Sequence, residues 1–85
     1  MQIQAPDTLT KTQRRLFLFL LEHEGRIVSH QSLLELLGRE DSRESRKLLS
    51  AHMSNLRGQI RHLPITIDTI TKQGYFLRRE LNKDH

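Results

Sequence analysis

Hydrophobic residues between positions 42 and 63 recur at helical spacing and form a stripe along one side of a predicted helix. At 100° per residue the stripe spans about 80° of arc. Its members are Leu49, Met53, Leu56, Ile60 and Leu63. The opposite side of this helix is small, polar and basic, and it carries no carboxylate. The pattern predicts a helix over 42–63 that packs against a core by one side and exposes a cationic face.

An earlier apolar run predicts the first helix. Residues 16–21 are all apolar, and Thr10 and Gln13 have the spacing of a capping box that would begin the helix. Gly25 is suited to the left-handed conformation that follows a helix end, so we expect the helix to run to about Glu24. A helix that is apolar nearly all round cannot bury every side in so small a domain. Leu18 is the residue that we expect to be left exposed.

The segment between these two helices predicts a short strand and a further helix. Residues 26–28 are suited to a lone strand, and Ser29 is a suitable N-cap for a helix through Leu37. Asp41 and Glu44 have the spacing of a second capping box, at the start of the helix over 42–63. Pro64 is expected to end that helix because it has no N–H to donate.

The last third of the chain predicts a β-hairpin. Residues 65–70 alternate and are β-branched, residues 75–77 are aromatic and apolar, and Gly74 supplies the glycine that a tight turn needs. The order of helix, short strand, two helices and hairpin is that of a winged helix. We therefore predict a mainly α fold with a small β-hairpin (α+β), a winged helix-turn-helix with three helices plus a C-terminal wing. Its parts would be an N-terminal extension or short strand (1–8), the winged-helix domain (9–79) and a flexible tail (80–85).

Charge is distributed unevenly along the 85 residues, which suffice for one domain. The formal net charge is +4, and from 45 to 81 the only acidic residues are Asp68 and Glu80. This balance favours an anionic partner for the second half of the chain. There is no cysteine, no apolar run that could span a bilayer and no signal-peptide pattern at the start. We expect a cytoplasmic, nucleoid-associated protein without a membrane partner.

The chain from Leu9 to Leu77 resembles the C-terminal DNA-binding (effector) domain of OmpR/PhoB-type response regulators, and it aligns with that pattern without a gap. The resemblance rests on the spacing of short motifs, of which the sharpest are His52-Met53-Ser54 with Leu56-Arg57, and Gly74-Tyr75. It implies a bacterial, sequence-specific double-stranded DNA-binding regulator of transcription. The helix over 42–63 would lie in the major groove and the wing over 65–79 near the minor groove.

The chain departs from the family pattern at its start and in the wing. Only eight residues precede Leu9, so we expect a stand-alone domain without the receiver and without a complete N-terminal sheet, and we do not carry over control by aspartyl phosphorylation. The family's wing usually has Arg-Gly where Thr71 and Lys72 stand. Lys72 then takes the minor-groove contact, or that contact is lost.

The resemblance and the polar face together give a set of predicted DNA contacts. Base contacts are assigned to Ala51, Ser54 and Asn55, because an Asn amide pairs with adenine and a methyl group packs on thymine. Phosphate contacts are assigned to Lys47, His52, Arg57 and Arg61, and wing contacts to Thr71 and Lys72. Two of the phosphate contacts have alternatives. His52 could instead be a packed histidine, and Arg57 could instead pair with an acid of the preceding helix.

A protein-interaction module is the alternative function. A winged helix of this kind would bind RNA polymerase or another regulator through Leu18, Arg39, Glu40 and Asp41. A homodimer on DNA is also open. The five histidines have no metal-ligand spacing and no glycine-rich phosphate loop is present, so we predict no catalytic residues, cofactor, metal or small-molecule substrate.

Overall fold

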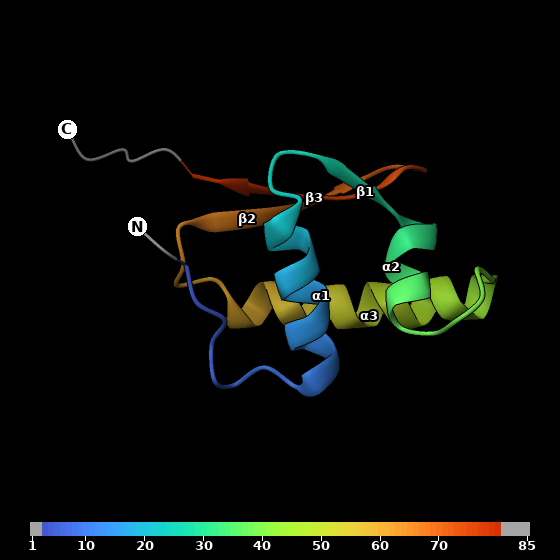
Figure 1. Cartoon of the computed structure of the whole chain (residues 1–85), viewed down its shortest axis with the longest axis horizontal. Helices are drawn as coiled ribbons and strands as arrows, with labels where there is room; N and C mark the ends of the chain where they lie inside the picture. The colour runs from blue at the N-terminus through green and yellow to red at the C-terminus, as the bar shows by residue number, and fades with distance from the viewer. Residues whose placement is uncertain (1–2, 81–85) are drawn as a thin grey trace.

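The computed structural model describes residues 3–80, in which helices and strands follow the winged-helix order (Figure 1). The helices lie on one side of a small sheet, and α1 crosses in front of α3. The predicted fold class, a winged helix-turn-helix with three helices plus a C-terminal wing, is confirmed. The elements are α1 (Lys11–Glu22), β1 (Ile27–Ser29), α2 (His30–Leu36), α3 (Arg43–Gln59), β2 (Ile65–Ile70) and β3 (Gly74–Arg79).

The sheet is antiparallel, with strand order β1-β3-β2. β3 lies in the centre, so the hairpin gains a third strand from the short segment before α2, which pairs as the sequence suggested. Val28 faces Tyr75 across β1 and β3, and Ile67 faces Leu77 across β2 and β3. This pairing fixes the wing against the start of the helix-turn-helix.

One hydrophobic core draws on every helix and strand. The predicted stripe of α3 is buried as expected, with Leu49, Met53 and Leu56 fully inaccessible and Ile60 2% exposed. The other large side chains that are fully buried are Leu16, Phe17, Leu20, Leu33, Leu34 and Leu77. Burial of this stripe holds α3 in place and leaves its opposite side to solvent.

The start of α1 follows the prediction closely. The Thr10 hydroxyl accepts from the Gln13 main-chain N–H at 3.1 Å, and the Gln13 side chain accepts from the Thr10 N–H at 3.0 Å, which completes the capping box. The helix ends at Glu22 rather than Glu24, because the chain already turns at His23. Gly25 has the predicted left-handed conformation, φ +82°, and its N–H donates to Leu77 O in β3.

The end of α3 differs from the prediction. The helix ends at Gln59, with Ile60 as its C-cap, whereas 42–63 was expected. The chain turns at once, with the Leu63 N–H donating to Ile60 O, because it must reverse to bring Ile65 into the sheet. Leu63 is therefore only partly buried, and Pro64 lies beyond the helix instead of ending it.

Gly74 was predicted to serve the hairpin turn but has a different role. It is the first residue of β3, and an added Cβ would lie 1.9 Å from Val28 O. The left-handed residue of the turn is Lys72, φ 66°. The close approach of β1 therefore requires a glycine here, and the φ of Gly74, +153°, is itself one that favours glycine.

The N-terminal residues pack on the core without forming a strand. Residues 3–10 contain a turn in which the Leu9 N–H donates to Pro6 O, and Ile3 and Leu9 are buried. The described part of the predicted segment 1–8, residues 3–8, forms no strand. At the other end, the Glu80 N–H donates to Pro64 O, and the rest of the predicted tail, 81–85, lies outside the described residues.

Candidate nucleic-acid interface

The first turn of α3 is fixed by Ser42, and the predicted capping box of Asp41 and Glu44 is wrong. The Ser42 hydroxyl accepts from the Ser45 main-chain N–H at 3.1 Å. Asp41 is instead bound by the Arg46 guanidinium, at 2.7 and 2.9 Å. The sequence alone does not distinguish the two caps, because a serine and an aspartate, both good N-caps, are adjacent. The hydrogen bond from Arg46 lowers the pKa of Asp41.

Between residues 47 and 58 the exposed side of α3 is mainly polar and carries one exposed lysine and no carboxylate. Leu48, which is 37% exposed, is its one large apolar side chain. The three residues predicted to contact bases, Ala51, Ser54 and Asn55, are all exposed on this side. Their exposed neighbours there are Lys47, Ser50 and Gly58. The structure thus brings the predicted base-contacting residues together on one accessible surface. We call this surface, residues 47, 50, 51, 54, 55 and 58, the polar face of α3.

Arg57 is held by the wing instead of being free on the polar face. Its Nε donates to Ile67 O at 2.8 Å and its Nη2 donates to the Thr69 hydroxyl. Its guanidinium also lies over the Tyr75 ring, 5.9 Å from the centroid. The alternative partner suggested from sequence, an acid of α2, is wrong. Arg57 therefore joins α3 to β2, a role that its position in the sequence did not reveal.

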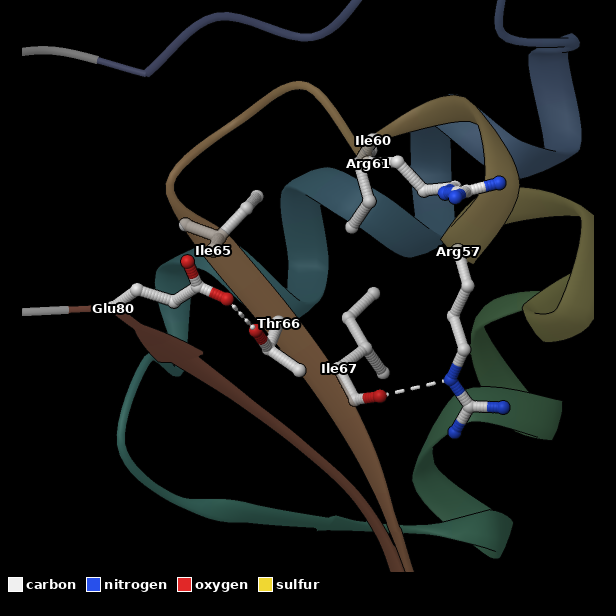
Figure 2. Close-up of a pocket in the computed structure, with 7 residues that line it drawn as sticks. All are labelled: Arg57, Ile60, Arg61, Ile65, Thr66, Ile67 and Glu80. Atoms are coloured by element: carbon white, nitrogen blue, oxygen red, sulfur yellow. Dashed lines mark hydrogen bonds between the residues drawn. The ribbon is translucent and has the colours of Figure 1, made fainter.

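Arg61 lies past the end of α3, at the far end of the helix from Lys47. It lines a cavity of about 280 Å³ together with Arg57, Thr66 and Glu80. Figure 2 shows Arg57 reaching to the Ile67 carbonyl and the Thr66 hydroxyl donating to Glu80, whereas no hydrogen bond joins Arg61 to the other residues drawn. Arg61 is exposed, and its contact with a phosphate remains a prediction.

His52 is half-buried and lies toward the core side of α3. It borders a different cavity, of about 180 Å³, that is also lined by Thr12, Leu37 and Leu48. This position fits the packed histidine that the sequence left open. Contact of His52 with a phosphate remains a prediction.

The wing presents Thr71 and Lys72 at the turn between β2 and β3, and both are exposed. The Gln73 N–H donates to Ile70 O at 2.9 Å, which closes the turn. In Figure 1 this turn lies toward the same end of the molecule as the first turn of α3. Lys72 and Lys47 are thus cations on the same end of the domain.

A ring cluster that the sequence did not predict links the wing to α2. His30, the first residue of α2, contacts the Tyr75 ring edge-on at 5.6 Å between centroids, and Tyr75 is 4% exposed. Burial and, to a smaller degree, the positive charge of Arg46 lower the pKa of His30. With Arg57 on the same ring, Tyr75 is the point at which α2, α3 and β3 meet. The Gly74-Tyr75 motif was the only sequence signal of it.

The residues predicted as a partner surface do not lie in one cavity. Leu18 is 45% exposed, as expected, and lines a groove of about 450 Å³ beside α1. Arg39 lines the smaller cavity that His52 borders. Arg39 and Glu40 are exposed, and Asp41 is engaged by Arg46.

The part of the chain that the structure describes contains neither a metal-ligand cluster nor a membrane-spanning helix. Among residues 3–80, no group of three or more His, Cys, Asp or Glu side chains is placed to hold a metal ion. Over the same residues, no helix is both long and apolar enough to cross a membrane.

Comparison with known proteins identifies the family. Residues 4–77 match the family model described as "Transcriptional regulatory protein, C terminal". The chain belongs to this family. Its resemblance to OmpR/PhoB-type effector domains is therefore confirmed, and the family is one of DNA-binding domains of transcriptional regulators.

Two relatives of this family member agree with the assignment. The regulatory protein VanRc of Enterococcus gallinarum is 28% identical over 74 residues, which are 84% of this chain and 32% of that protein. The chain thus spans about a third of the length of this curated relative. The C-terminal domain of the nisin resistance regulator NsrR, a lantibiotic response regulator, superposes with a TM-score of 0.68 at 28% identity, covering 92% of this chain and 84% of that one.

Proposed function

We propose that this domain binds specific sites on double-stranded DNA and regulates transcription by occupying them. α3 would lie in the major groove and the β2–β3 turn beside the minor groove. The observation that carries the proposal is the polar face of α3, which is exposed, free of carboxylates and backed by a fully buried stripe. A location in the cytoplasm, at the nucleoid, follows from this function.

Small side chains on the polar face support close approach to base edges. Ala51 would contact a thymine methyl group, and Asn55 would bind the N6 and N7 atoms of adenine. The Ser54 hydroxyl could donate to or accept from a base edge. The small residues beside them, Ser50 and Gly58, leave room for the groove walls. Without a carboxylate among them, nothing on this surface repels the phosphates.

Cations at both ends of α3 would hold the phosphate backbone. Lys47 and Lys72 lie at one end and Arg61 at the other, and all three are exposed. Arg57 has less capacity to bind a phosphate than was predicted, because two of its donors already bind Ile67 O and the Thr69 hydroxyl of β2. We assign Arg57 to positioning the wing, so that helix and wing meet DNA as one rigid surface.

Fluorescence anisotropy with a labelled duplex obtained by site selection tests the proposal. Three phosphate-bound cations predict a slope of about −2.7 for log K against log salt, or about a 40-fold loss between about 50 and 200 mM. The expected result is that slope together with a preference for the selected site over a scrambled duplex. Binding that is insensitive to salt, or equal for both duplexes, would contradict the proposal.

The loop between α2 and α3 supports a second, protein-binding role alongside DNA binding. The ion pair of Asp41 with Arg46 ties this loop to α3, and Arg39 and Glu40 remain exposed on it. RNA polymerase, or another regulator, is the partner that the sequence suggested. Replacing Glu40 by Arg should reduce polymerase recruitment on a promoter while leaving DNA affinity unchanged; loss of both together would show that the loop has no separate partner.

A homodimer on DNA is the remaining element of the proposal. Two domains side by side would give two bound copies per selected site and cooperative titration curves. The stoichiometry measured in the same anisotropy experiment decides this, because a single copy per site excludes it.

A further inference from the structure

The outer side of α1 carries a line of four exposed residues. Lys11, Arg15, Leu18 and Glu22 are all exposed and are spaced four, three and four residues apart, so they lie along one side of the helix. They are opposite the buried Leu16 and Leu20. In Figure 1, α1 lies in front of α3, with no other described helix or strand in front of it.

Charges on α1 run against its helix dipole. The first turn contains Lys11 and Arg14 and no acidic residue, and the last turn contains Glu22 and no basic residue. A helix alone is stabilised by the reverse order. Neither Arg15 nor Glu22 forms an ion pair with another of residues 3–80. The stability of the isolated domain therefore does not explain this arrangement.

An apolar groove lies beside Leu18. It has a volume of about 450 Å³, and Phe19, Leu21 and Leu36 line it between the charged side chains of Arg15 and Glu22. A protruding leucine next to an apolar groove is self-complementary, because two copies related by a two-fold axis can each place Leu18 in the groove of the other.

We propose that the outer side of α1 binds the same surface of a second copy of the chain, with the two α1 helices antiparallel about a two-fold axis near Leu18. Arg15 lies three residues before the axis and Glu22 four after it, about 4.5 and 6 Å along the helix. Arg15 of each copy then lies against Glu22 of the partner subunit, and the pair forms twice. The axis also turns the basic start of each helix toward the acidic end of the other.

Charge complementarity selects this partner and this direction. A parallel arrangement of two α1 helices would place cation against cation and acid against acid. The antiparallel one pairs each Glu22 with Arg15 of the other copy and opposes the two helix dipoles. A second copy of the chain supplies the charged and apolar groups that complement this side of α1. Its pattern, cations at one end, leucine in the middle and acid at the other, is its own complement.

The size of α1 predicts a weak dimer. A helix of 12 residues is about 18 Å long, so the contact falls below the roughly 1,200 Å² of stable interfaces. The contact leaves the polar face of α3 free, because the buried side of α3 is the one that faces α1. The inference is therefore independent of DNA binding.

Sedimentation equilibrium of the whole chain between about 10 µM and 1 mM in low salt tests the proposal. The weight-average mass should rise from 10.0 kDa toward twice that value as the concentration increases. Arg15→Glu and Glu22→Arg should each weaken association about 10-fold or more, since each replaces two attractions by two repulsions. The double variant R15E/E22R should return to within about 3-fold of the wild type, because the exchanged charges again face opposite charges.

Controls separate this effect from misfolding and from net charge. Each single change brings α1 closer to the charge order that its dipole favours, so melting temperatures followed by circular dichroism should equal or slightly exceed that of the wild type. Arg43→Glu makes the same change of charge on α3 and should leave the mass unaffected. A wild-type mass that stays at 10.0 kDa throughout overturns the proposal, as does a double variant that is as monomeric as the single ones.

Discussion

Arg57 of α3 and Ile67 of β2 are joined by a hydrogen bond from the guanidinium Nε to the main-chain oxygen of Ile67, 2.8 Å long. β2 is an edge strand, and this carbonyl points away from its partner β3 toward the helix. The bond satisfies an edge group that is otherwise open to another strand, and it sets the position of the wing relative to α3. Because this hydrogen bond joins β2 to α3, the wing and the helix form one surface instead of the wing being a loose hairpin.

Replacing Arg57 by Ala should destabilise the fold by about 1–3 kcal/mol, because a partly buried carbonyl loses its donor. Urea unfolding measures this change. Arg57→Lys keeps the charge but cannot hold both Ile67 O and Thr69, so it should also destabilise. Arg61→Ala, at the same cavity, should stay within about 0.5 kcal/mol of the wild type. Equal stability of the Arg57 and Arg61 variants would show that the tie to β2 is unimportant.

Gly74 and Gly58 make a matched pair of substitutions. Gly74→Ala places a Cβ 1.9 Å from Val28 O, so we expect a loss of about 3 kcal/mol or more, or failure to fold. Gly58→Ala meets no atom within 4 Å and lies within α3, so it should stabilise by about 0.5–1 kcal/mol. Thermal unfolding of both variants checks this. Stabilisation by Gly74→Ala would mean that β1 does not approach β3 as described.

Replacing Asn55 by Ala should relax base preference at one position of the selected site and weaken binding there by about 1–3 kcal/mol. Site selection with the variant, scored position by position, is the measurement. Lys72→Ala serves as the comparison, because a wing contact to the backbone should weaken all sequences alike. A selected site identical to that of the wild type would remove Asn55 from base reading.

Stability should decrease as the pH falls below about 6.5, because the pKa of His30 is lowered in the folded state. The unfolded chain then binds a proton that the folded chain takes up only at lower pH, so protonation favours unfolding. Melting temperatures at about pH 7.5 and about pH 5.5 report the effect. His30→Gln should reduce the difference between the two temperatures; an undiminished difference would assign it to other groups.

Local sequence patterns sufficed for the elements and the core, and for two helix caps, Thr10 of α1 and Ser29 of α2, because those depend on neighbours along the chain. The stripe of Leu49, Met53 and Leu56 and the capping box at Thr10 are local patterns of this kind. The role of Arg57 was not predictable, because its partners Ile67 and Thr69 lie ten or more residues away and one of them is a main-chain atom.

The same distinction explains the errors at the ends of α3 and at Gly74. Ser42 rather than Asp41 caps the helix because Arg46 binds the aspartate, and Gly74 is required by Val28, a residue of another strand. The polar face was predicted from the sequence because its exposure follows from the buried stripe. What that face contacts depends on a partner, and neither the sequence nor the fold of one chain contains it.

The central claim, that the polar face of α3 is the surface that meets DNA, is tested most directly by two charge reversals of equal size. Lys47→Glu changes a cation on that face, and Arg26→Glu changes one in the segment between α1 and β1, which lies at the sheet and away from α3 in Figure 1.

Affinity for the selected duplex at fixed salt is the quantity to compare. We predict that Lys47→Glu weakens binding about 10-fold or more, whereas Arg26→Glu changes it by no more than about 3-fold. Equal losses in the two variants, or a greater loss for Arg26→Glu, would contradict the account.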